Sequence, residues 1–224
     1  MTTFFVEGLK HVFQIGTVVP SSRWLARAMT RSLRRRGSPK RVLEVGPGTG
    51  AITRVILSSL NQGDELHLVE INPAFCRQIE KKLLRRYRRE TPGVQVELRC
   101  ESIMSVPFDG TFDIVISSLP FFAFAPSTVR AILGKLTGLL AEDGELTYMH
   151  YAGVRHLKAP FVRRPRRREL SRIEAICRSR RRRDGASCEF VLLNILPSLV
   201  VSSKKNGNGK SPGLISRGHG TESE

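Results

Sequence analysis

Apolar and polar positions alternate along the chain in a way that predicts strands separated by helices. From Lys40 onward, short apolar runs rich in β-branched residues follow one another, with helix-like patterns between them. This order is typical of a parallel sheet covered by helices on both faces, an α/β fold. The predicted strands are Arg41–Val45, Glu65–Glu70, Val94–Cys100, Phe112–Ser117 and Glu145–Tyr151. The predicted helices are Thr49–Leu60, Pro73–Arg89 and Ser127–Leu140.

The two ends of the chain have patterns of their own. Thr3–Gln14 predicts an amphipathic helix whose apolar side either packs against the domain as a lid or lies on a membrane. Cys188–Val201 is a further β-rich run, and Pro197 within it predicts a final strand at a sheet edge or with a bulge. The tail from Ser202 onward is rich in Gly, Ser, Lys and Asn, and we expect it to be disordered.

These patterns divide the chain into three parts. Residues 1–39 form a predicted helical extension, residues 40–202 form one folded domain, and residues 203–224 form the tail. A chain of 224 residues has room for one well-buried domain but not for two comfortable ones. The residue pattern of Arg163–Arg183 indicates neither a helix nor a strand clearly.

Charge points to a polyanionic partner. The chain has 37 Lys and Arg against 20 acidic residues, which gives a formal charge of +17 and a pI near 10.8. Thirteen of the basic residues and only two acidic ones lie between Arg155 and Arg183, and a second basic run extends from Arg77 to Arg89. Nucleic acid and an anionic bilayer would both satisfy such patches, and charge alone does not choose between them.

Cysteine usage and hydropathy narrow the setting. The four cysteines form no CxxC pair and no ligand spacing with the five histidines, which argues against a metal site or a disulfide framework and favours a reducing cytoplasm. No apolar run reaches the roughly 18 to 20 residues that cross a bilayer, and the start of the chain lacks the pattern of a signal peptide. We therefore expect a protein that is neither secreted nor integral to a membrane.

A glycine-rich turn follows the first predicted strand. Residues 44–50 read Glu-Val-Gly-Pro-Gly-Thr-Gly, which places Gly46, Gly48 and Gly50 between a strand and a helix. Glycine permits positive φ and carries no Cβ, so the backbone can approach a nucleoside-containing ligand at the carboxyl end of the strand. A plain tight turn and a dinucleotide site remain open on this motif alone.

The second predicted strand ends in an acidic residue. Glu70 lies about twenty residues past the turn, where a carboxylate can accept hydrogen bonds from both hydroxyls of a ribose. Together, residues 44–50 and the Val-Glu-Ile-Asn-Pro run at residues 69–73 resemble the cofactor motifs of class I S-adenosylmethionine (SAM) methyltransferases. This resemblance covers residues 40–151 and implies a Rossmann-like sheet that binds SAM.

The same resemblance assigns further cofactor contacts. It places Glu44 at the methionine end of the cofactor and Ile71 beside Glu70 in the ribose-binding motif. Glu101 stands where an acidic residue of such enzymes contacts the adenine amino group, with Ser102 next to it. In this interpretation residues 40–202 are the SAM-binding catalytic domain, and no metal is required.

The fourth predicted strand leads into the expected acceptor site. Ser118, Leu119, Pro120 and Phe121 form a rigid turn with aromatic residues, and Tyr148 lies on the fifth strand near the same edge. Methyl transfer from a sulfonium is an in-line displacement, so the site chiefly needs to align a neutral amine. Aromatic faces also stabilise a methylated cation, by about 0.5 to 2 kcal/mol each. A lid or core role is the alternative for these aromatic residues.

Residues 14–29 resemble the Gly-x-Val-x-Pro-Ser-Ser-Arg-x-Leu-Ala-Arg-x-Met entry of bacterial phospholipid N-methyltransferases. Those enzymes methylate phosphatidylethanolamine stepwise towards phosphatidylcholine, and they share the leucine-proline acceptor turn and a closing strand like residues 193–197. The chain departs from the family at Leu196 and Ser198, where members tend to have Asn-Leu-Pro-Pro. The resemblance spans residues 4–202.

The sequence therefore predicts a phospholipid N-methyltransferase, held peripherally on the inner face of a membrane through anionic lipid. An RNA adenine methyltransferase is the rival, favoured by charge but weakened because Ser118 stands where such enzymes carry Asn or Asp. A methyltransferase-like binding protein without activity is the third hypothesis. The sequence fixes neither the number of methyl groups added nor the oligomeric state.

Overall fold

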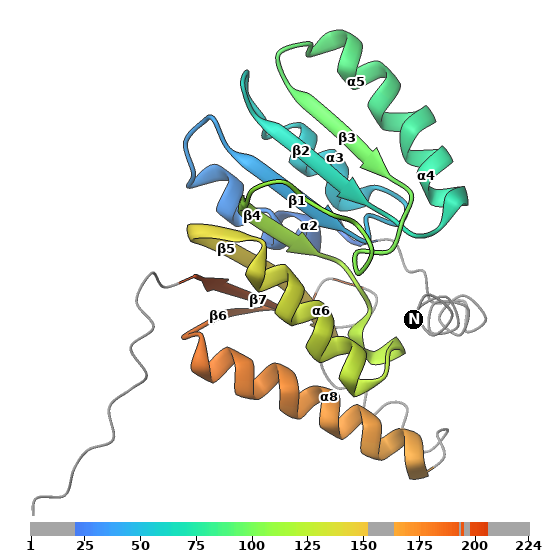
Figure 1. The fold of residues 1–224 in the computed structure, drawn as a ribbon, viewed down its shortest axis with the longest axis vertical. Coiled ribbons are helices and arrows are strands. Elements are labelled where there is room, and N and C mark those ends of the chain that lie inside the picture. The colour runs from blue at the N-terminus through green and yellow to red at the C-terminus, as the bar shows by residue number, and fades with distance from the viewer. Residues whose placement is uncertain (1–20, 152–163, 193, 195–197, 206–224) are drawn as a thin grey trace, which may run out of the picture.

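A computed structural model describes residues 21–151, 164–192, 194 and 198–205, and these residues build a single mixed sheet (Figure 1). The sheet has seven strands in the order β3-β2-β1-β4-β5-β7-β6. The first five run parallel, and β7 pairs antiparallel with both β5 and β6. The strands are β1 Arg41–Val45, β2 Glu65–Val69, β3 Gln95–Arg99, β4 Phe112–Ser117, β5 Leu140–Tyr151, β6 Ser187–Val191 and β7 Ser198–Lys204.

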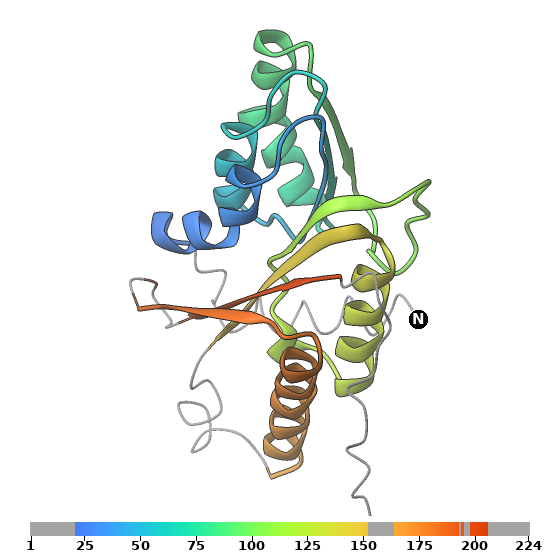
Figure 2. The same cartoon turned by 90° about the vertical axis from the view of Figure 1, so that its left-hand side faces the viewer.

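Helices cover both faces of the sheet (Figure 2), which confirms the predicted α/β architecture. Helices α2, α3 and α4 pack on one face, whereas α6 and α8 pack on the other, and each layer has its own apolar core. The α-helices are α2 Arg23–Met29, α3 Ala51–Leu57, α4 Pro73–Ile79, α5 Arg85–Glu90, α6 Pro126–Gly138 and α8 Arg164–Arg183. The shorter helical turns are η1 Arg31–Arg34, η2 Glu80–Leu84, which is π-helical, and η3 Phe121–Ala123.

Local sequence explains where the helices beside the glycine turn begin. Asn72 caps α4, because its side-chain oxygen accepts a 2.9 Å hydrogen bond from the Ala74 N–H, and Pro73 takes the first helical position. Gly50 caps α3 with a φ of +83°, which an L side chain rarely adopts. Both helices therefore start next to the carboxyl ends of their preceding strands.

The structure corrects the end of the predicted sheet. Cys188–Val201 is not one strand but parts of two, β6 and β7, which pair antiparallel. Pro197 falls between them, and a proline cannot donate to a strand ladder. Strand β7 continues to Lys204, so the prediction of disorder from Ser202 onward is wrong for Ser202–Lys204. Residues 206–224 lie outside the described part of the chain.

The basic segment that the pattern assigned poorly is a helix. Helix α8 spans 20 residues and buries Leu170, Ile173 and Cys177, spaced three and four apart, against α6 and the sheet. Ten arginines and two glutamates take most of the other positions. The apolar stripe is therefore present but narrow, and the charges on both sides of it hide it from a sequence pattern.

Part of the predicted N-terminal extension belongs to the core. Helix α2 buries Leu25, Ala26 and Met29 in the apolar layer shared with α3. The predicted helix Thr3–Gln14 lies outside the described residues. Within the described ranges, none of the helices is long and apolar enough to cross a bilayer.

Candidate cofactor and acceptor site

The candidate site lies at the carboxyl ends of β1, β2 and β4. Strand β1 pairs with β2 on one side and β4 on the other, so that Val45 is level with Val69 and with Ser117. The chain leaves β1 in one direction and later returns to its other side, which creates a topological switch point. In parallel α/β sheets, ligands bind outside the carboxyl ends of the strands at this point.

Backbone hydrogen bonds fix the glycine turn at this edge. The Gly46 N–H donates to the Val69 carbonyl at 2.9 Å, and the Gly50 N–H donates to the Pro47 carbonyl at 2.9 Å. All three glycines of the turn have positive φ. The turn is therefore tied to the end of β2, where the acidic partner follows.

Glu70 holds the turn directly. Its Oε2 accepts a 2.9 Å hydrogen bond from the Gly48 N–H, and its Oε1 accepts one of 2.9 Å from the Asn72 N–H. Burial raises the pKa of Glu70, and these two N–H groups lower it part of the way back. Each carboxylate oxygen has a further lone pair, so the side chain can still accept from two ribose hydroxyls.

The space next to the Cα atom differs among the three glycines of the turn. A Cβ on Gly46 would lie 2.7 Å from Leu119 Cδ2, and one on Gly50 would lie 2.7 Å from Leu83 Cδ1, so leucine side chains fill the space at both positions. A Cβ on Gly48 would meet nothing within 4 Å. The room for a ligand that the sequence predicted at all three positions is therefore found at Gly48, next to Glu70.

Glu44 is a buried carboxylate without a partner. Neither of its oxygens has a hydrogen-bond partner among the described residues, and the side chain is fully buried. Burial raises the pKa of Glu44 to about 8; the nearby Thr53 hydroxyl, which forms no hydrogen bond of normal geometry with it, opposes the shift, and the Glu70 charge adds to it. A cationic group at the glycine turn would stabilise the charged form, so this orphaned acid fits the amino group of the methionine part of SAM.

The remaining predicted cofactor residues surround the same edge. Glu101 is exposed after β3, and Ser102 is buried, with its Oγ accepting a 3.2 Å hydrogen bond from the Met104 N–H. Ser102 thus shapes the loop that presents Glu101. Ile71 is half-buried against the apolar layer that contains α6. Glu101 is therefore the exposed acid of the loop after β3, and Ser102 Oγ is engaged as an acceptor within that loop.

The predicted acceptor turn closes onto the glycine turn. The Ser118 N–H donates to the Val45 carbonyl at 2.9 Å, and the Leu119 side chain covers Gly46. Ser118 and Pro120 are half-buried, whereas Leu119 and Phe121 are buried. The Ser118 Oγ has no hydrogen-bond partner among the described residues. Ser118 therefore contributes a buried hydroxyl that no described residue satisfies, and an acceptor can reach it only when the turn opens.

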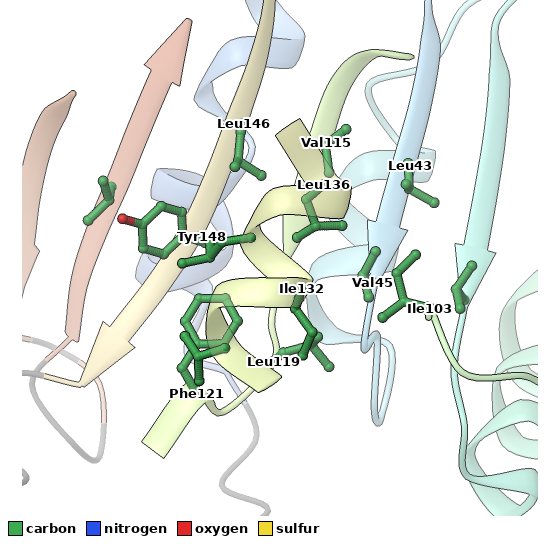
Figure 3. Close-up of a cluster of buried hydrophobic side chains, with 14 of the residues drawn as sticks. Leu43, Val45, Ile103, Val115, Leu119, Phe121, Ile132, Leu136, Leu146 and Tyr148 are labelled. Atoms are coloured by element: carbon green, nitrogen blue, oxygen red, sulfur yellow. The ribbon is translucent and has the colours of Figure 1, made fainter. Parts of the chain in front are cut away.

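Tyr148 lies in the core beneath the turn (Figure 3). Its ring centroid is 5.7 Å from that of Phe121, and only 1% of the residue is exposed. Its hydroxyl has no hydrogen-bond partner in the described part of the chain, and burial raises its pKa. The predicted role of Tyr148 at an amine headgroup would require the hydroxyl to be reachable, whereas the structure gives it a packing position.

Sequence reasoning missed one contact of the acceptor turn. Arg166, near the start of α8, donates from Nη2 to the Phe122 carbonyl at 2.6 Å and pairs with Glu169. The helix that carries the basic patch therefore braces η3, the segment that follows Pro120. The sequence predicts only an anion-binding surface here, because no pattern links residue 166 to residue 122.

Comparisons with known proteins agree with this geometry. Residues 42–144 match a family model described as a methyltransferase domain. An ornithine lipid N-methyltransferase of Singulisphaera acidiphila is 26% identical over 141 residues, covering 63% of this chain and 72% of the relative. A malonyl-[acyl-carrier protein] O-methyltransferase of Halorhodospira halophila is 29% identical over 157 residues, covering 55% of this chain and 49% of the relative.

Solved structures share the fold. An O-methyltransferase from Bacillus cereus in complex with S-adenosylhomocysteine (SAH) has a TM-score of 0.62 at 12% identity. The match covers 88% of this chain and 90% of that enzyme. A putative rRNA-methylase from Clostridium thermocellum has a TM-score of 0.59 at 14% identity, and the match covers 82% of this chain and 98% of the methylase. The chain has the Rossmann-like fold of SAM-dependent methyltransferases, and residues 42–144 match their domain model. The relative named for a lipid substrate, the ornithine lipid N-methyltransferase, is a distant homologue of this chain.

Proposed function

We propose that the chain transfers methyl groups from SAM to the amino headgroup of phosphatidylethanolamine and of its partly methylated products. The observation that carries the proposal is the closure of the acceptor turn on the glycine turn, with Leu119 packed on Gly46 and the Ser118 Oγ left without a partner. We take this buried, unsatisfied hydroxyl as the hydrogen-bond acceptor for the substrate amine when the turn opens. A lipid amine needs little more than that for alignment.

The residues of the chain divide the work by position. Gly48 and Glu70 hold the adenosyl part, and Glu44 offsets the charge of the methionine amino group. When bound, SAM supplies a methyl group already activated on a sulfonium. Ser118 accepts a hydrogen bond from the amine, which orients its lone pair, and Phe121 with Tyr148 forms the rigid floor below the turn. No strong protein nucleophile is needed.

Two further observations support a lipid amine as the acceptor. The motif at residues 14–29 resembles the entry of bacterial phospholipid N-methyltransferases, and a relative that matches 63% of the chain is named for N-methylation of ornithine lipid. Both substrates present an amine on an amphiphile. The high positive charge supports an anionic membrane surface as partner, with the enzyme held peripherally at the inner face.

RNA adenine methylation is the second candidate. The outward side of α8 carries exposed arginines at positions 167, 168, 172, 178, 182 and 183, which would bind RNA phosphates equally well. Against it, Ser118 replaces the amide or acid whose carbonyl holds an adenine amino group. We rank it below the lipid acceptor for this reason.

Methyl transfer to defined acceptors tests the proposal. The purified chain is incubated with methyl-labelled SAM and, in parallel, with vesicles of phosphatidylethanolamine, vesicles of ornithine lipid, and total RNA. Label is expected in the phosphatidylethanolamine fraction, as mono- and dimethylated products. Label that enters only ornithine lipid or only RNA would replace the proposed acceptor.

Ser118→Ala sharpens the same assay. Loss of one hydrogen bond to the amine is expected to lower kcat about tenfold, with SAH binding unchanged. Ser58→Ala is the matched control, because Ser58 is exposed at the end of α3 and its hydroxyl only donates to the Val55 carbonyl. If both variants keep full activity, Ser118 has no part in orienting the acceptor.

A further inference from the structure

Helix α2 has an unusual outer face. Its inner side is buried, and its outer side consists of Arg23, Trp24 and Arg27. Trp24 is the only tryptophan of the chain, and 43% of it is exposed. The guanidinium carbons of Arg23 and Arg27 lie 5.2 and 5.7 Å from the centre of the Trp24 ring. No acidic residue lies on this helix.

This face begins at the same edge of the sheet as the cofactor site. The Ser22 N–H donates to the Asn194 side-chain oxygen at 3.1 Å, so the start of α2 is tied to the segment that follows β6. Strand β6 runs antiparallel to β7, and β7 runs antiparallel to β5, so β6 ends at the edge where β4 and β5 end. The first turn of α2 therefore lies at the carboxyl edge.

A second exposed apolar side chain lies at this edge. Leu192 directly follows β6 and is 68% exposed, although its neighbour Val191 is buried in the layer that contains α2. Figure 2 shows α2 on the side of the sheet opposite to α6 and α8. Trp24 and Leu192 thus both lie near the carboxyl edge of the sheet.

We propose that Trp24 and Leu192, framed by Arg23 and Arg27, form a docking surface for an anionic lipid bilayer. Tryptophan is favoured at the membrane interface because its ring is amphipathic. Leucine gains by leaving water, and a basic residue near an anionic surface contributes about 1 kcal/mol. Docking through this surface sets the carboxyl edge of the sheet, and with it the acceptor turn, against the membrane.

A bilayer suits this surface better than single-stranded nucleic acid. Bases bind by stacking on aromatic faces, but guanidinium groups already lie over the Trp24 ring. Leu192 offers no face for stacking, whereas its exposure fits insertion among acyl chains. The inference deepens the proposed function, since a lipid substrate must reach this edge, but docking itself is measured without turnover.

The lone tryptophan reports on docking directly. The purified chain is titrated with vesicles of phosphatidylglycerol and phosphatidylcholine, with pure phosphatidylcholine vesicles, and with single-stranded RNA. With phosphatidylglycerol present, the Trp24 emission is expected to shift to the blue and to be quenched by brominated acyl chains. Neither change is expected with pure phosphatidylcholine or with RNA.

Variants separate this surface from general basic charge. Leu192→Asp, and Arg23→Glu combined with Arg27→Glu, are each expected to weaken vesicle partitioning about tenfold or more. The matched control is Arg85→Glu with Arg89→Glu, two exposed arginines on α5, which precedes β3 and so lies towards the opposite edge. SAH binding measured on every variant verifies the fold.

The outcomes are distinct. Co-sedimentation with vesicles while the Trp24 emission stays unchanged would overturn the inference, because another surface would then be docking. A shift with RNA and none with vesicles would overturn it as well, as would equal losses in the α2 and α5 variants. Docking through Trp24 without methyl transfer to lipid would leave the inference standing and refute the proposed function alone.

Discussion

Leu119 packs so closely on Gly46 that a Cβ at position 46 would lie only 2.7 Å from Leu119 Cδ2. This contact joins the turn after β1 to the turn after β4, so the cofactor motif and the acceptor motif support one another. Gly46 is therefore required for packing, whereas Gly48, two residues later, faces open space and binds Glu70. The two glycines should respond differently to the same substitution.

Gly46→Ala and Gly48→Ala test this division of labour. Gly46→Ala is expected to lower the free energy of unfolding by about 2 to 4 kcal/mol, because it adds backbone strain at φ +74° and a clash with Leu119. Gly48→Ala adds strain alone, about 1 to 2 kcal/mol, but places a methyl group in the open space where we propose that the cofactor binds. Denaturant unfolding and SAH calorimetry on both variants measure the difference. Equal stability losses with equal SAH affinities would contradict the assignment.

Glu44 should make stability depend on pH. Its pKa is raised from 4.5 to about 8 in the folded chain, so the folded state holds a proton that the unfolded state has lost. The free energy of unfolding therefore falls as pH rises from 4.5 to 8, and it levels off above that. Glu44→Gln removes this fall and is expected to add about 1 to 3 kcal/mol at pH 8, while SAH affinity drops. Urea unfolding at pH 5, 6.5 and 8 measures how the free energy of unfolding depends on pH in the wild type and in Glu44→Gln.

The contrary outcome is a pair of parallel curves, in which the free energy of unfolding changes with pH in the same way in the wild type and in Glu44→Gln. Parallel curves would show that Glu44 ionises normally. The SAH titration adds an independent readout. Unchanged SAH affinity in Glu44→Gln would remove the carboxylate from the cofactor site.

Tyr148→Phe distinguishes packing from chemistry. The hydroxyl is buried without a hydrogen-bond partner among the described residues, a state that costs about 1 to 3 kcal/mol. Its removal is therefore expected to leave methyl transfer unchanged and to keep or slightly raise the free energy of unfolding. Phe121→Ala is the contrasting variant, since loss of its ring is expected to cost about 3 kcal/mol or more and to lower activity. A large activity loss in Tyr148→Phe alone would restore the hydroxyl to the acceptor site.

The core strands could be predicted from the sequence because burial on both faces leaves a plain signature. The bounds of β1 and β4 agree with the prediction at both ends, since each is a short, mostly apolar run that is almost wholly buried. The β6–β7 hairpin could not be separated, because the apolar run continues through the connection and only Pro197 marks it. Helix α8 could not be predicted because its apolar stripe is narrow and charged residues take most of the other positions.

The site was predictable to the extent that it depends on local order. A glycine turn after one strand and an acid after the next imply proximity, and the Gly48–Glu70 hydrogen bond realises it. The contacts of Leu119 with Gly46 and of Arg166 with Phe122 join distant segments. Such contacts depend on how loops and helices pack across the sheet, which no spacing in the sequence encodes.

The bond between Gly48 and Glu70 is the centre of this account, and calorimetric titration with SAH of the wild-type chain and of Glu70→Gln tests it most directly. Gln leaves only one side-chain oxygen for the two backbone N–H groups and the ribose hydroxyls. The account predicts one SAH site in the wild type and affinity about 10- to 100-fold weaker in Glu70→Gln, with similar unfolding curves. Equal affinity in the two proteins, or no binding by the wild type, would contradict it.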